Sequence, residues 1–287
     1  MNRILGGVLV LGVVAASVCA QQKTVMIRCD DIGMCHAVNM AAKQVIDSGM
    51  PFSASVMFAC PWYQEAVELL RRHPEVSVGV HLTLNAEWKN YRWGPVAGAG
   101  AVRSLVDSAG YFLPSRALLF GQNPKVDEVE RELRAQIDRA MRSGLHIDYL
   151  DYHMGAAVNT PELRSLVERL AGEYHLGISR YFGEEDIEGY YDAPPEDKTG
   201  KLLDLAAHVH GGAPQLFVFH IGMRTPEMDA LVDQNDFGLK EMSRHREAEL
   251  HALLSPGFRR ALEDQRVEFL TYRRLIDREG LDAMKRP

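Results

Sequence analysis

The sequence predicts an α/β protein folded as a single (β/α) barrel, similar in plan to a TIM barrel. Two observations lead to this fold class. Short apolar runs alternate with segments of helical periodicity along most of the chain, which is the order expected of a parallel sheet. The 287 residues are 46% hydrophobic and show no change of composition that would mark a linker, so one large domain is favoured over two. A doubly wound open sheet is the alternative.

The first half of the expected barrel is recognised by where its helices end and by how their apolar residues are spaced. One helix stops at Gly49, the next stops before Pro74, and the third repeats apolar residues at helical spacing until Gly144. A long stretch, residues 85–123, is rich in Gly, Pro and aromatic residues and is expected as an excursion or lid. The expected strands are residues 24–29, 53–58, 76–80 and 147–150, and the expected helices are residues 37–48, 62–72 and 126–141.

The second half continues the same alternation. Thr160 is the expected N-cap of the helix that follows it, because a threonine hydroxyl can accept a bond from the first turn. The run Leu216–Phe219 is the most apolar of the later strands. The expected helices are residues 161–173, 201–210, 241–254 and 258–263, and the expected strands are residues 177–180, 216–219 and 267–270.

Residues 1–20 differ in character from the rest of the chain. Arg3 is followed by a short apolar stretch that ends at the small residue Ala20, which is typical of a secretory signal peptide. We therefore expect a signal peptide over residues 1–20, a domain over residues 21–287, and a secreted or periplasmic protein. An uncleaved membrane anchor is the alternative.

The charge pattern excludes one class of partner. The net charge is −7, and lysines and arginines are scattered along the chain instead of clustered. Because binding to a phosphate backbone needs a concentrated basic surface, the sequence predicts no nucleic-acid partner. It leaves the oligomeric state open, with a homodimer as one option.

Polar side chains follow four of the expected strands. Asp30 and Asp31 come after the first strand, His81 after the third, His153 after the strand ending at Leu150, and His220 after the strand ending at Phe219. Active sites of parallel α/β folds gather at the carboxyl ends of strands, so we expect these side chains to share one rim. A carboxylate with two imidazoles is a suitable ligand set for Zn²⁺ or a similar divalent ion.

Each of these residues also has an ordinary structural explanation. A single histidine after a strand is more often a hydrogen-bonded residue than a metal ligand. The doublet Asp30-Asp31 could cap the helix that begins near Ala37, and Asp151 could orient His153 or stabilise a turn. The coincidence at four strand ends is what favours a site.

The motifs at these strand ends resemble those of the YdjC-like carbohydrate deacetylases. The resemblance rests on Arg28-Cys29-Asp30-Asp31-Ile32-Gly33-Met34, on Gly79-Val80-His81-Leu82-Thr83-Leu84, on Leu150-Asp151-Tyr152-His153 and on Phe219-His220-Ile221-Gly222, where Ile221 stands in place of the family's proline. The segment Arg246-Glu247-Ala248-Glu249-Leu250 is also similar. In the family, further histidines follow the third motif, whereas Met154-Gly155-Ala156-Ala157 stands here.

This resemblance implies a distorted (β/α) barrel and a divalent metal ion, Zn²⁺ or Mg²⁺. It implies that Asp31, His81 and His153 bind the metal and that Asp30 is the general base. It implies that His220 binds substrate or acts as general acid. The expected reaction is removal of an acetyl group from an N-acetylated sugar, with an acetylated oligosaccharide or amino sugar as substrate. A carbohydrate-binding protein with little turnover is the alternative, and a hydrolase for another amide or ester is a third.

Overall fold

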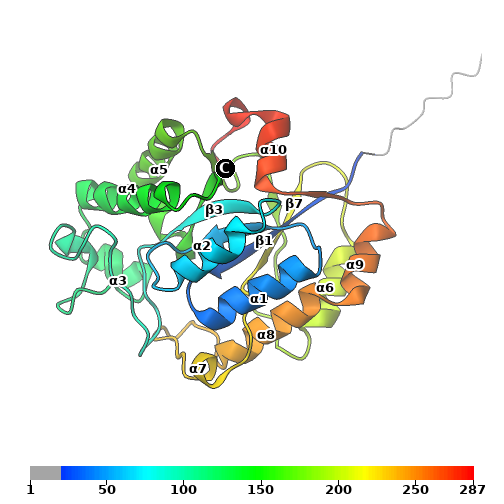
Figure 1. Ribbon diagram of the computed structural model, residues 1–287, viewed down its shortest axis with the longest axis horizontal. Helices are drawn as coiled ribbons and strands as arrows, with labels where there is room; N and C mark the ends of the chain where they lie inside the picture. Colours follow the sequence, from blue (N-terminus) through cyan, green and yellow to red (C-terminus); the bar gives the residue numbers. More distant parts are fainter. Residues whose placement is uncertain (1–20) are drawn as a thin grey trace, which may run out of the picture.

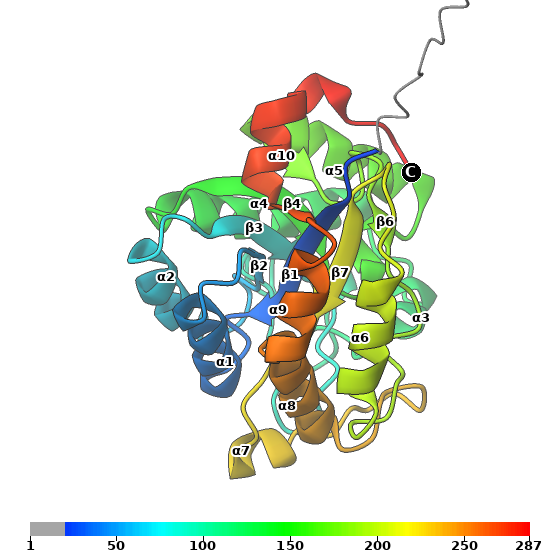
Figure 2. The ribbon, with the colours of Figure 1, turned by 90° about the vertical axis from the view of Figure 1, so that its right-hand side faces the viewer.

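The computed structural model describes residues 21–287, and their strands form one curled parallel sheet (Figures 1 and 2). The strand order is β5-β4-β3-β2-β1-β7-β6, and β8 pairs with the first residues of β1. In the part of the chain that the structure describes, this path does not return to its start, so the barrel is open between β5 and β6. The strands are β1 (Thr24–Ile32), β2 (Ser53–Val56), β3 (Ser77–Leu82), β4 (Ile147–Tyr152), β5 (Gly177–Ile178), β6 (Glu185–Asp186), β7 (Gln215–Phe219) and β8 (Glu268–Leu270).

Helices surround the outer face of this sheet. In Figure 2, α6, α8 and α9 lie outside β1 and β7, and α1 and α2 lie beside β2. The helix α10 lies at the end of the sheet where the chain enters β1 (Figure 1). The helices are α1 (His36–Asp47), α2 (Tyr63–Arg71), α3 (Arg116–Gly121), α4 (Val126–Arg142), α5 (Pro161–Tyr174), α6 (Lys198–Ala207), α7 (Pro226–Asp229), α8 (Met242–Leu253), α9 (Pro256–Glu263) and α10 (Tyr272–Glu279).

The predicted fold class is confirmed: strands and helices alternate in the expected order, and the sheet is a distorted, parallel (β/α) barrel. The Thr160 cap is also confirmed, since its hydroxyl accepts a bond from the amide of Leu163. Several boundaries were predicted wrongly. The strand expected to end at residue 29 runs to Ile32, and the helix expected over 201–210 begins at Lys198 and ends at Ala207. The short elements β6, α3, α7 and α10 were not predicted, because such short segments carry little periodicity.

The inside of the barrel is filled by side chains from several strands and from the start of α10. The ring of Tyr149 stacks on that of Tyr272 with centroids 4.1 Å apart. Gly79 in β3 makes room for this stack, because a Cβ there would lie 2.4 Å from the Tyr149 ring. Interiors filled by side chains in this way are typical of small barrels, so the strands enclose a packed core and not a pore. The buried members of this cluster are Met26, Tyr149, Leu216, Leu270, Tyr272 and Leu275.

The predicted signal peptide, residues 1–20, lies outside the described residues. Among residues 21–287, the helices are all too short or too polar to cross a bilayer.

Candidate active site

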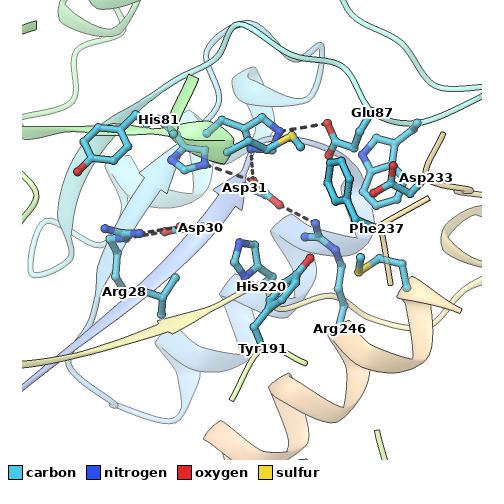
Figure 3. A pocket seen from close by; sticks show the side chains of 18 of the residues that line it. Arg28, Asp30, Asp31, His81, Glu87, Tyr191, His220, Asp233, Phe237 and Arg246 are labelled. Carbon is cyan, nitrogen blue, oxygen red and sulfur yellow. Dashed lines mark hydrogen bonds and ion pairs between the residues drawn. The ribbon is translucent and has the colours of Figure 1, made fainter. Parts of the chain in front are cut away.

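The four strand ends meet at a cavity of about 440 Å³ on the carboxyl side of the barrel (Figure 3). A cavity of this size suits a small organic ligand such as a sugar. Every residue singled out at the sequence level lines it, so the structure brings the five together as expected. They are Asp30, Asp31, His81, His153 and His220.

Asp31 lies at the centre of the cavity floor, where β1 leaves its regular pairing with β2. The register of the two strands shifts between Cys29 and Ile32, and Asp31 takes a left-handed backbone conformation with φ 62°. Such an irregularity redirects a side chain at the end of a strand. Both aspartates lie within β1, and helix α1 begins after Cys35, so the explanation of the doublet as a helix cap is wrong.

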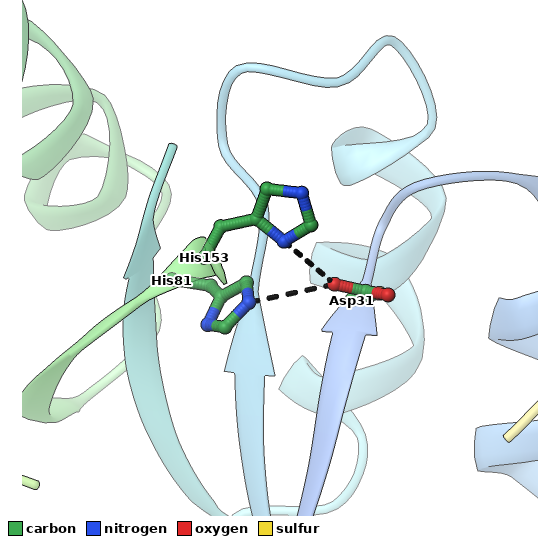
Figure 4. Close-up of side chains that lie close together, drawn as sticks. All are labelled: Asp31, His81 and His153. Atoms are coloured by element: carbon green, nitrogen blue, oxygen red, sulfur yellow. Dashed lines mark ion pairs between the residues drawn. The ribbon is translucent and has the colours of Figure 1, made fainter. Parts of the chain in front are cut away.

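One carboxylate oxygen of Asp31 faces two imidazoles (Figure 4). Its Oδ1 lies 3.4 Å from Nε2 of His81 and 3.3 Å from Nδ1 of His153. This oxygen is buried and has no hydrogen-bond partner among the described residues. The other oxygen, Oδ2, accepts a hydrogen bond of 2.6 Å from the guanidinium of Arg246 in α8. One ligand atom from each of the three residues lies within 4.8 Å of the others, which would allow them to hold an ion.

Each histidine is oriented by a carboxylate on its far side. Asp151 accepts from Nδ1 of His81 at 2.7 Å, so this ring presents Nε2 to the cavity. Glu87 lies 3.1 Å from Nε2 of His153, so that ring presents Nδ1 instead. A carboxylate behind a histidine fixes both the ring tautomer and its direction, as in many metal sites. Asp151 therefore orients His81 and not His153, contrary to one of the two alternatives considered for it.

The electrostatics of this group follow from burial and close opposite charges. Burial alone would raise the pKa of the Asp31 carboxyl, but the charge of Arg246 and the two histidines hold that pKa well below its usual value. Burial would lower the pKa of His81, yet the charges of Asp151 and Asp30 raise it to about 9. Burial acts in the same way on His153, and Glu87 with Asp31 raises its pKa to about 10. Asp31 thus favours its ionised form, and His81 and His153 favour their protonated forms, so each of these three groups stabilises the charge of its neighbours.

Asp30 is held beside this group by a buried arginine. Both of its oxygens accept from Arg28, at 2.7 and 2.8 Å. The same guanidinium lies 3.0 Å from Asp151 and donates to Ser179 at 2.6 Å. Arg28 thus joins Asp30 to the carboxylate that orients His81. A bidentate pair of this kind fixes the direction of a carboxylate firmly.

His220 approaches from the opposite side of the cavity, at the end of β7. Its backbone amide donates to Glu249 of α8 at 2.6 Å, and its ring lies against that of Tyr191 with centroids 5.2 Å apart. The ring atom Nδ1 is buried and has no partner among the described residues. The protein itself therefore leaves this nitrogen without a partner, and His220 lines the cavity (Figure 3).

Three charged residues of the site were not assigned a role from the sequence. Arg28 lies two residues before the aspartate doublet, and a lone arginine in an apolar strand could have been noticed as a buried counter-ion. Arg246 lies in a segment that the family resemblance included without a role. Glu87 lies in the 85–123 excursion, where no pattern marks it.

The aromatic residues of the excursion mostly pack it onto the barrel. Trp93 and Phe112 are buried, and Trp88 is buried although its edge lines the cavity. The ring of Tyr111 pairs with the Arg92 guanidinium instead of facing the cavity. Tyr191, which follows β6 in the chain, lines the cavity and is 43% exposed.

Comparison with known families shows which protein family these motifs belong to. The family model described as YdjC-like protein matches residues 24–264, which is most of the chain. The chain belongs to the YdjC-like family. The carbohydrate deacetylase of Thermus thermophilus is 32% identical over 267 residues, covering 85% of this chain and 90% of that protein. The carbohydrate deacetylase of Enterococcus faecalis is 29% identical over 272 residues, covering 88% and 98%.

Solved structures agree with the fold of this YdjC-like chain. A protein from Enterococcus faecalis, provisionally described as a cellobiose-phosphate cleavage protein, superposes with a TM-score of 0.72 at 25% identity, covering 88% of this chain and 98% of that one. The Xyl-CE4 domain of a xylanase from a termite hindgut metagenome superposes with a TM-score of 0.50 at 11% identity, covering 90% and 92%. The second likeness concerns the barrel alone.

One prediction is overturned by these comparisons. A secreted or periplasmic location was expected from residues 1–20, and this is wrong: the YdjC-like relatives are generally cytosolic enzymes. The expectation rested on one arginine, a short apolar stretch after it and the small residue Ala20 at its end. A pattern of that length is shared by segments that are not export signals, so it was weaker than the motif resemblance.

Proposed function

We propose that this protein is a metal-dependent carbohydrate deacetylase that hydrolyses the acetamido group of an N-acetylated sugar. The observation that carries the proposal is the convergence of Asp31, His81 and His153 on one cavity floor, with Asp30 beside them. The carbohydrate deacetylases among its relatives support the substrate class.

The three converging residues fit a divalent ion. The unpartnered, buried Oδ1 of Asp31 and the two imidazole nitrogens that face it are the donor types that Zn²⁺ prefers, and mixed sites of this kind also accept Mg²⁺. Such an ion, when bound, supplies Lewis acidity toward the acetyl carbonyl and lowers the pKa of water.

The other residues of the cavity move protons and hold the substrate. Asp30 accepts a proton from the attacking water, and the two bonds from Arg28 hold its carboxylate in place. The C–N bond of the amide breaks, acetate leaves, and His220 delivers a proton to the sugar amine. General acid and base groups placed on opposite sides of the scissile bond are the arrangement this reaction needs.

Acetate release tests the proposal directly. Metal-stripped protein is supplied with Zn²⁺, Mg²⁺ or Co²⁺ and incubated with N-acetylglucosamine oligomers, and acetate and free amine are measured. We expect release of both in equal amounts and only with added metal. Bound metal and tight sugar binding without acetate would contradict the enzymatic proposal and favour a carbohydrate-binding protein.

Glu87→Gln tests the orientation of His153. Gln can still form one hydrogen bond to the ring but no longer favours a single tautomer, so metal affinity should fall by about 10- to 100-fold. Competition with a coloured chelator measures this affinity. Glu132→Gln is the matched control, because Glu132 is also buried and binds excursion amides, at Val96 and Ala97, away from the cavity. Equal losses in both variants would mean that only the excursion had loosened.

The two histidines also predict how metal binding depends on pH. Their pKa values in the folded, metal-stripped protein are about 9 and about 10, above the unfolded value of about 6.5. Protonation of these two histidines therefore stabilises the fold of the metal-stripped protein. This stabilisation is fully present below pH ~6.5 and is lost as the pH rises through the two folded pKa values. A metal ion must displace those protons, so its apparent affinity should rise over this window, with about two protons released near pH 7. Calorimetry in buffers of different ionisation enthalpy counts the protons, and a count of zero would contradict the assignment.

A further inference from the structure

A buried lysine lies behind the rim of the cavity, outside the group described so far. Lys198 is the first residue of α6 and has no exposed surface. Its ammonium group donates to the carbonyl oxygens of Tyr190 and Tyr191, at 3.2 and 2.9 Å. It also forms an ion pair of 3.0 Å with Glu249 of α8. These partners satisfy all three N–H donors of the ammonium.

Glu249 joins this lysine to the other side of the cavity. Its Oε1 accepts from Lys198, and its Oε2 accepts from the backbone amide of His220. Glu249 is 1% exposed, so both charges of the pair are withdrawn from water. Burying an ion pair is expensive, and apolar residues of similar size often give equal or better stability. Stability alone is therefore a weak reason for this pair.

The two ends of this network are neighbours in the cavity. Tyr191 and His220 lie ring against ring, and both line the pocket (Figure 3). Tyr191 lies in a loop between β6 and α6. Lys198 donates to its carbonyl oxygen and also pairs with Glu249, which connects that loop to α8. Arg246, one turn before Glu249 on the same helix, binds Asp31. A single helix thus sets the positions of groups on the floor and the rim.

We propose that the Lys198–Glu249 pair is a positioning device that holds Tyr191 and His220 in register over the scissile bond, and that Tyr191 contacts the sugar. This rests on the proposed deacetylase function. Lys198 and Glu249 do not reach the cavity themselves. They act through the backbone of the two residues that do.

The test uses a variant that keeps the network uncharged. Lys198→Met alone leaves Glu249 as an unpaired buried charge and is expected to unfold readily. Lys198→Met combined with Glu249→Gln removes both charges, and the Gln oxygen still accepts from the amide of His220. Lys201→Met is the matched control, because it lies one turn along α6 and its ammonium makes no ion pair among the described residues. Metal content and melting temperature check that each variant is folded.

We expect the neutral double variant to lose roughly 10- to 100-fold in kcat/KM for acetate release, as small misplacements of reacting groups do. Lys201→Met should match the unaltered protein. The decisive measurement adds Tyr191→Ala to the neutral pair. If Lys198 acts through Tyr191, kcat/KM of the combined variant should be little lower than that of the neutral pair or of Tyr191→Ala. If the two changes act independently, their fold losses in kcat/KM should multiply.

Unchanged kinetics in the neutral pair, or multiplying effects with Tyr191→Ala, would overturn this inference and leave the proposed function intact. If the unaltered protein releases no acetate, the proposed function fails separately. The neutral pair, Tyr191→Ala and the combined variant are then compared by their Kd for N-acetylglucosamine oligomers, measured by calorimetry. There too, coupled losses support the positioning role, and unchanged or multiplying losses overturn it.

Discussion

Replacing His81 or His153 by alanine should remove the bound metal and reduce acetate release to the background rate. Each ring supplies one of the two imidazole nitrogens that face Asp31, at 3.4 and 3.3 Å. Asp31→Ala should have the same effect, because it removes the atom on which both rings converge. The expected loss is about 10³-fold or more, since even one lost oxyanion donor costs about 10²- to 10³-fold. Metal content by mass spectrometry and initial rates measure the two effects together.

The controls separate metal loss from damage to the fold. Alanine at residue 81 leaves the buried Asp151 without its histidine partner, so His81→Asn, which can still donate a hydrogen bond, is made beside it. His36→Ala is the matched control, because His36 pairs with Glu65 at the surface and does not line the cavity. Full metal occupancy in the Asp31, His81 and His153 variants would contradict the ligand assignment.

The positions of the candidate site residues could be predicted because they follow from local sequence. A parallel sheet places the carboxyl end of each strand at the same edge, so Asp31, His81, His153 and His220 could be collected without knowing the strand order. The strand order and the gap between β5 and β6 were not predictable in this way. They depend on which apolar faces pack together across the whole chain.

The supporting residues could not be found from sequence because they come from distant segments. Glu87 is 66 residues from the histidine it contacts, and Arg246 is 215 residues from Asp31. The residues that flank a charged side chain in the sequence do not indicate which oppositely charged residue it will contact in the fold. Arg28 is the exception, since it lies two residues before Asp30 and points to the same face of the strand.

The prediction of a secreted or periplasmic location was wrong, and it rested on a single segment of the chain. Residues 1–20 were interpreted from their own residue pattern, and no second segment of the chain could be used to check that interpretation. The motifs at the strand ends, by contrast, had to agree with one another in order and spacing. Agreement among several distant positions therefore deserves more weight than one compositional segment.

Asp30→Asn should keep the metal and lose most of the rate. The amide cannot accept the proton of the attacking water, and loss of a general base lowers kcat by about 10²- to 10⁴-fold. Asp31, His81 and His153 are untouched by the change, so metal content should stay at the level of the unaltered protein. Arg28 keeps Asp151 as a counter-ion at 3.0 Å, which limits the structural cost of removing the charge.

Asp148 offers a closely matched control at the other end of the barrel. It is also a buried aspartate held by one guanidinium through two bonds, each 3.0 Å long, from Arg273. Asp148→Asn therefore breaks the same kind of ion pair without touching the cavity. If the two variants lost stability alike but only Asp30→Asn lost rate, the carboxylate of Asp30 would be identified as the base. A rate in Asp30→Asn close to that of Asp148→Asn would instead mean that Asp30 serves mainly to balance the charge of Arg28, and another group would have to take the proton.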